Sequence, residues 1–134
     1  MHRATKIVVI LAAVYVLLVM TFESLLGIYQ PTYDGTMVIT TTDATGERAD
    51  RVLAKMEVDG AIYAAANHWP RAWYHQALDN PEVSLTLEDG PADYLAVQLS
   101  DAEAAKVDAA YSLPLFFRVL TGFPPRYILR LDPN

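Results

Sequence analysis

The chain contains no cysteine, and this absence excludes several kinds of chemistry at once. Without thiols there is no disulfide framework, no thiolate nucleophile and no cysteine-ligated metal centre. The composition therefore leaves open whether the protein works in a reducing or an oxidising compartment.

Basic residues are also scarce, with 10 Lys and Arg against 16 Asp and Glu and a formal net charge of −6. Nucleic-acid binding depends on clustered Lys and Arg side chains that neutralise phosphates and release counterions. We therefore expect no nucleic-acid partner.

Familiar catalytic and nucleotide-binding motifs are missing as well. No G-x-S-x-G, G-x-G-x-x-G or phosphate-loop pattern occurs in the chain. His68 and His75 lie seven residues apart, without the H-E-x-x-H spacing that places two histidines on one side of a helix. Neither a metal site nor hydrolase chemistry is expected.

What the chain does have is a long apolar run near its N-terminus. No charged residue occurs from Ile7 to Phe22, and residues 7–20 show no polar stripe. As a helix this run spans roughly 24 Å, slightly less than a ~30 Å hydrocarbon core, and residues 25–29 extend it. The residues after Phe22 lack the A-x-A-like pattern of small side chains that marks a signal-peptide cleavage site. The pattern predicts a single-pass anchor in membrane lipid over residues 1–30, with a buried core helix as the alternative.

The charges that flank the run predict an orientation. Arg3 and Lys6 precede it, and the next basic residue is Arg48. The positive-inside rule would then place the N-terminus in the cytoplasm and the rest of the chain outside.

Residues 31–134 are predicted to form one mainly β domain with short helices. Alternation of period two, typical of half-buried strands, marks six segments. They are residues 36–42, 51–58, 61–66, 83–88, 93–99 and 126–131. Asp59-Gly60 is a hairpin turn signal. Six mostly antiparallel strands in about 100 residues favour a small β-barrel.

Helices are predicted between these strands. Pro70 precedes a helical pattern over residues 71–78, and Ser100 with Glu103 reads as a capping box that opens a helix to about residue 110. The apolar stretch 113–120 is expected to be a short helix or lid.

The densest candidate site runs from a strand end into a helix start. Asn67, His68, Trp69, Arg71 and Trp73 lie there. A helix N-terminus and an arginine suit an anionic ligand, and two tryptophans suit a planar ring. In the alternative interpretation both tryptophans belong to the core, and Asn67 or His68 merely caps the helix.

A second candidate is the polar turn 43–51. Gly46 permits a close approach of the backbone, and Arg48 and Arg51 could hold a charged ligand tail. The alternative is a solvated hairpin loop whose arginines pair with Glu47 and Asp50.

The order of these segments resembles the deazaflavin-dependent nitroreductase / quinone reductase family. The resemblance covers roughly residues 36–133, and its most specific parts are W-Y-H at 73–75 and D-N-P-E-V at 79–83. Further matching pieces are T-T-T at 40–42, A-A-N at 65–67 and I-L-R-L-D-P at 128–133.

The resemblance implies a split β-barrel related to flavin-binding oxidases. It also implies that reduced 8-hydroxy-5-deazaflavin (coenzyme F-420) passes a hydride to a lipophilic, quinone-like or nitro-compound acceptor. FMN on the same barrel, or no cofactor, are the alternatives, and a homodimer is left open.

The resemblance further implies roles for individual residues. The cofactor's tail would face Gly46, Arg48 and Arg51, and its ring would lie near Asn67, His68, Trp69, Arg71 and Trp73. The acceptor would contact Tyr111, Phe116 and Phe117, and the proton donor would be His68, with Tyr74 second.

Two features keep a second hypothesis open. The family's basic turn is replaced here by an acidic one with Asp43 and Glu47. The charge bias favours an extracytoplasmic domain, whereas a deazaflavin cofactor implies the cytoplasm. The alternative to a reductase is a non-catalytic, membrane-tethered barrel that binds another ligand or a protein partner.

Overall fold

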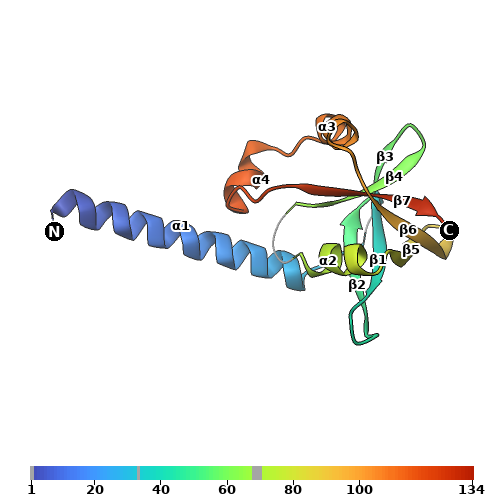
Figure 1. Cartoon of the computed structure of the whole chain (residues 1–134). Coiled ribbons are helices and arrows are strands. Elements are labelled where there is room, and N and C mark those ends of the chain that lie inside the picture. The colour runs from blue at the N-terminus through green and yellow to red at the C-terminus, as the bar shows by residue number, and fades with distance from the viewer. Residues whose placement is uncertain (1, 33, 68–70) are drawn as a thin grey trace.

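The computed structural model describes residues 2–32, 34–67 and 71–134, in which a long helix is attached to a curled β-sheet (Figure 1). Helix α1 (Arg3–Ile28) projects away from the sheet, and its most apolar window has a mean hydropathy of 2.4. Only 6% of that window is buried, so the alternative of a buried core helix is wrong. By length and composition alone, α1 is able to cross a membrane.

Seven antiparallel strands form the sheet within the described residues, in the order β2-β1-β5-β6-β7-β4-β3. The strands are β1 (Thr36–Thr42), β2 (Arg48–Ala54), β3 (Met56–Val58), β4 (Ala61–Ala66), β5 (Glu82–Leu87), β6 (Gly90–Gln98) and β7 (Tyr127–Pro133). The outermost strands of the sheet, β2 and β3, are consecutive in the chain. The sheet must therefore curl until its two edges meet, and β2 lies against β4 across a seam.

The predicted strand 51–58 is divided in the structure. Lys55 separates β2 from β3. Its backbone N–H still donates to the carbonyl of Gly35 at 2.8 Å, in register with the β1–β2 pairs, and from Met56 onward the chain pairs with β4 instead. This break carries the chain from one edge of the sheet to the other, and it explains why seven strands are found where six were predicted. The Asp59-Gly60 turn is confirmed, with positive φ at both residues.

Two apolar clusters lie on opposite sides of the sheet. The larger cluster fills the inside of the curl and is covered by α2 (Ala72–Asp79). It contains Met37, Ile39, Ala64, Ala66, Trp73, Tyr74, Ala77, Val83, Leu85, Leu129 and Leu131. The smaller cluster lies outside, under α3 (Asp101–Ala110), and contains Met56, Tyr63, Ala65, Val107 and Ile128. Alternate residues of β4 and β7 therefore serve two different cores.

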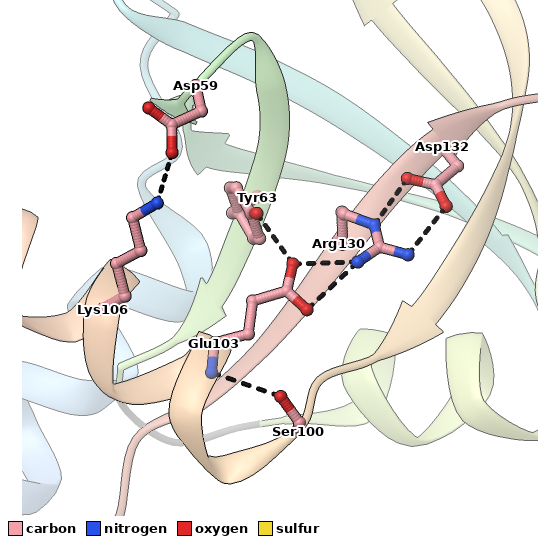
Figure 2. Close-up of polar contacts among 7 residues, drawn as sticks. All are labelled: Asp59, Tyr63, Ser100, Glu103, Lys106, Arg130 and Asp132. Atoms are coloured by element: carbon pink, nitrogen blue, oxygen red, sulfur yellow. Dashed lines mark hydrogen bonds and ion pairs between the residues drawn. The ribbon is translucent and has the colours of Figure 1, made fainter.

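A polar network fastens α3 to the outside of β4 and β7 (Figure 2). The Glu103 carboxylate accepts the Tyr63 hydroxyl at 2.9 Å and the Arg130 guanidinium at 2.8 and 3.1 Å. Arg130 also donates to Asp132 at 2.7 Å. These hydrogen bonds, with Arg130 first, hold the pKa of Glu103 below its usual value, and both carboxylates raise the pKa of Arg130.

The helix signals in the sequence are confirmed. Ser100 caps α3 by accepting the Glu103 N–H, and Lys106 of the same helix pairs with Asp59 (Figure 2). The stretch 113–120 contains a short helix, α4 (Leu115–Leu120), which lies beside the second half of α1 (Figure 1).

Candidate functional site

A cavity of about 350 Å³ opens along the seam where β2 meets β4. We call it the seam cavity. Its walls come from the end of α1, from both strands and from α4, and they include Leu26, Tyr29, Leu53, Asn67 and Phe117. The end of the apolar helix is therefore part of the cavity wall.

Two further cavities share residues with the seam cavity. One, of about 170 Å³, shares Gln30 and Arg51 with it and reaches Trp73. The other, of about 350 Å³, shares Asn67 and reaches Arg118 and Arg126. We call the three together the seam groove.

Arg51 lies between the first two of these cavities and points at the end of α1. Its guanidinium donates to the carbonyls of Leu26 and Gly27, both at 3.4 Å. The last carbonyls of a helix have no partner within it and carry its negative dipole, so a cation there is favourable. Burial lowers the pKa of Arg51, and the nearby Glu23 opposes this shift.

Gln30 makes a second link between α1 and the barrel. Its side-chain carbonyl accepts the Val52 N–H at 3.0 Å, and its amide donates to Gly27 at 3.0 Å. Gln30 was not among the predicted site residues, because its role depends on β2, which lies more than twenty residues further along the chain.

Arg126 is the centre of polar contacts at the other end of the groove. It donates to Asn67 Oδ1 at 2.8 Å, to Asp108 Oδ1 at 2.8 Å and to the Tyr111 carbonyl at 2.6 Å. The sequence placed Arg126 at the start of a strand without a site role. The two prolines before it, at 124 and 125, mark a loop, and this position next to a loop is the signal in the sequence that could have indicated a site residue.

Arg71 is almost completely buried, with 3% of its surface exposed. It donates to the Pro125 carbonyl, and its guanidinium lies 4.9 Å from the centre of the Tyr127 ring. Burial lowers the pKa of Arg71, while Tyr127 and Glu23 act in the opposite direction. Arg71 therefore joins the start of α2 to the loop before β7.

The aromatic residues of α2 belong mainly to the core. Trp73 is buried there and also lines the small cavity beside Arg51. The Tyr74 ring stacks on Tyr127 with 5.2 Å between ring centres. His68 and Trp69, the predicted proton donor and ring contact, lie outside the described residues.

The structure does not bring Gly46 and Arg48 to the seam groove. Residues 48 and 51 differ by an odd number in one strand, so their side chains leave opposite faces. Arg48 lines a separate cavity of about 440 Å³, with Thr40 and Asp93 among its residues. Gly46 lies at the tip of the exposed β1–β2 hairpin.

Asp43 organises this hairpin tip by itself. Its carboxylate accepts the Thr45 hydroxyl at 2.6 Å and the N–H groups of Thr45 and Glu47 at 2.8 and 3.0 Å. These bonds, led by that of the Thr45 hydroxyl, lower the pKa of Asp43. An ionised carboxylate in the turn fits a solvated hairpin loop better than a cradle for an anionic tail.

The three predicted acceptor residues lie in different places. Phe117 lines the seam cavity. Tyr111 is fixed to β3, because its hydroxyl bonds the backbone N–H and carbonyl of Glu57, both at 3.0 Å. Phe116 points outward, with 75% of its surface exposed.

In the described part of the chain, no three His, Asp or Glu side chains gather closely enough to hold a metal ion. The groove's polar groups include arginines and amides, which bind anions and the edges of polar rings, beside hydroxyl groups and the carboxylates of Asp50 and Asp108.

No protein-family model matches the chain, and no curated protein matches it. Solved structures do match. One, described as a domain-swapped dimer, is 21% identical, with a TM-score of 0.60, and the match covers 75% of this chain and 82% of that one. An F420-H2 dependent reductase (FDR-A) is also 21% identical, with a TM-score of 0.59 over 78% of this chain and 99% of that one. The fold is a split β-barrel.

The same barrel occurs in proteins with different ligands. The haem storage protein HutZ from Vibrio cholerae matches with 19% identity and a TM-score of 0.58, over 75% of this chain and 82% of that one. The comparisons therefore confirm the predicted fold class, a split barrel with short helices, and function has to be argued from the groove.

Proposed function

We propose that the protein is a membrane-anchored oxidoreductase that transfers a hydride from a reduced deazaflavin to a quinone or nitro-compound acceptor. The observation that carries the proposal is the seam cavity, whose walls come jointly from the split barrel and from the end of the apolar helix α1. An active site in that place would lie beside the membrane in which such acceptors dissolve.

The size and the lining of the seam groove support the cofactor named in the proposal. Ligand pockets commonly enclose about 300–1,000 Å³ and combine apolar walls with a few polar groups. Leu26, Leu53 and Phe117 would contact the planar ring, and Asn67 and Arg51 would meet its polar edge. Arg118 and Arg126 in the adjoining cavity suit an anionic tail.

In this proposal the cofactor and the chain have different chemical roles. When bound, the cofactor supplies the hydride, so the chain needs no nucleophile or metal of its own. The chain's residues orient the ring, exclude water with Leu26 and Phe117, and neutralise negative charge through their guanidinium groups.

A binding titration tests the proposal. We expect the full chain in detergent to bind reduced or oxidised F-420 saturably, as followed by cofactor fluorescence. Phe117→Ala and Arg51→Gln should each weaken binding by about 10-fold or more. A charge-assisted contact contributes about 1.5–3 kcal/mol, and so does the burial of a phenylalanine side chain. Phe116→Ala and Arg48→Gln are matched controls, because these side chains lie outside the seam groove, and they should leave affinity unchanged.

The outcome decides between the hypotheses. Equal weakening by the control variants would place the binding site elsewhere. The same titration with FMN tests the flavin alternative. If the folded chain binds neither compound, the reductase proposal fails.

A non-catalytic, membrane-tethered barrel is the second candidate. It is favoured by the fact that Arg51, Arg71 and Arg126 already donate to protein carbonyls or side chains. A reporter fused to the C-terminus distinguishes the two: a cytoplasmic barrel supports the reductase, and an extracytoplasmic one supports the tethered binding protein.

We also propose that the chain forms a homodimer. Strands β2 and β3 are at the edges of the sheet order, and one solved structure with this fold is described as a domain-swapped dimer. Light scattering on the detergent-solubilised protein, with the detergent mass subtracted, should give twice the mass of 14.9 kDa.

A further inference from the structure

Helix α4 and the loop after it expose a group of large apolar side chains. Leu115 is 67% exposed, Phe116 75%, Val119 37% and Phe123 51%. We call these four residues the α4 patch. From residue 112 to residue 125 the chain contains no acidic residue, and its single charged one is Arg118. Clustered exposed apolar side chains of this kind mark an interaction surface.

The α4 patch is continuous with the apolar surface of α1. The Tyr15 hydroxyl donates to the Val119 carbonyl at 2.9 Å, and the rings of Phe22 and Phe117 meet edge to face at 6.1 Å. A Cβ on Gly122 would come within 3.1 Å of Val19. These contacts place α4 level with residues 15–22 of α1.

The length of α1 then determines how deep α4 lies. A ~30 Å hydrocarbon core needs about 20 helical residues, and counting from Ile7, the first residue after Lys6, this stretch ends at Leu26. Residues 15–22 fall inside it. The stretch of α1 in which every residue is exposed, residues 3–18, measures only about 24 Å and is too short to span the core alone.

From this geometry we propose that the α4 patch inserts into the leaflet next to the barrel, as a second membrane element beside α1. Its occupant is the lipid bilayer itself. The inference rests on the membrane anchoring in the proposed function and adds a contact that α1 alone does not provide.

The two charged residues near this depth, Glu23 and Arg118, differ in exposure. Glu23 is only 7% exposed, and its negative charge favours the charged forms of Arg51 and Arg71 in the barrel. Arg118 is exposed; it lines the outer cavity of the seam groove and lies 5.7 Å from the centre of the Phe123 ring, and a long cationic side chain can reach from such a position to the membrane surface. A carboxylate or guanidinium at membrane depth is tolerated when it faces protein or a cavity.

Two consecutive residues connect the bilayer with the site. Phe116 faces outward from α4, whereas Phe117 lines the seam cavity. A lipophilic acceptor could thus pass from the leaflet around α4 into the groove without crossing bulk water.

The absence of native cysteines allows a direct test with single-cysteine variants. Phe116→Cys probes the α4 patch, Val14→Cys probes α1, and Glu88→Cys probes the exposed β5–β6 turn. Each full chain is labelled with a polarity-sensitive nitrobenzoxadiazole dye and placed in phosphatidylcholine vesicles with or without chain-linked doxyl quencher.

We expect the labels at residues 116 and 14 to shift to the blue and lose most of their fluorescence to the quencher, while the label at residue 88 keeps its emission. A quenched label at residue 14 with an unquenched one at 116 overturns the inference and leaves the anchor intact. If the labels at residues 14 and 116 are both unquenched, the membrane anchor and the insertion of the α4 patch both fail. If the label at residue 88 is quenched as well, the contact with lipid is not specific to α4, and the inference is overturned. Leu115→Cys, also exposed, repeats the measurement should the variant at residue 116 misfold.

Discussion

Arg126 offers a sharp test of how the seam groove is held together. Its side chain is only 12% exposed and donates to three oxygens, on Asn67, Asp108 and Tyr111. Arg126→Met keeps the aliphatic part of the side chain and removes every donor. The change therefore isolates the polar contribution of one residue.

The expected loss can be worked out from the partners. Asp108 is 59% exposed, so its ion pair contributes less than about 1 kcal/mol. A charged donor on the Asn67 and Tyr111 oxygens contributes about 1.5 kcal/mol each, at the low end because water can enter the cavity and replace it. The free energy of unfolding should fall by about 3 kcal/mol. At roughly 4–8 °C per kcal/mol for a domain of this size, the midpoint should fall by at least about 12 °C.

Thermal unfolding followed by near-ultraviolet circular dichroism measures this change in the full chain in detergent. Arg48→Met is the matched control, because Arg48 is an exposed arginine on the barrel, and it should change the midpoint little. A loss at Arg126 no larger than that at Arg48 would refute the assigned role.

Three further changes test other contacts. Thr41→Val removes the 2.6 Å hydrogen bond that the buried Thr41 hydroxyl donates to Gln76 of α2. The free energy of unfolding, measured by urea titration, should fall by about 1 kcal/mol. Glu103 has a lowered pKa in the folded state, so its stabilising pair with Arg130 is complete above the usual value of 4.5 and is lost as the pH falls below it. Melting curves of Glu103→Gln should therefore depend less on pH in that acidic range than those of the unchanged protein. Gly122→Ala places a side chain at φ 75° and against Val19, so unfolding free energy should drop by about 1–2 kcal/mol, with Val19→Ala relieving only the steric part.

Local features of the fold could be predicted from the sequence because they depend on neighbouring residues. The Asp59-Gly60 turn needs only positive φ, and the Ser100–Glu103 capping box needs only one helical turn. The break at Lys55 could not be predicted, because alternation continues through residues 51–58. At this point the chain changes its partner strand from β1 to β4, and such a change depends on the pairing of other segments.

The candidate site was predicted less completely, for the same reason. Arg48 and Arg51 were predicted to hold the same ligand tail because they are close in the sequence. In strand β2 their side chains point to opposite faces. Arg126 and Gln30 were missed because their partners come from distant segments. Phe117 lines the seam cavity, and its role as an acceptor contact stays a prediction, whereas Tyr111 of the same predicted set is bonded to Glu57.

The end of α1 supplies Leu26, Tyr29 and Gln30 to the wall of the seam cavity. A protease that cut the chain between α1 and β1 would therefore release a barrel that lacks one wall of the seam cavity. The carbonyls that Arg51 now contacts would leave with the helix. Under the proposed function, such a cut would therefore remove part of the ligand site together with the membrane anchor.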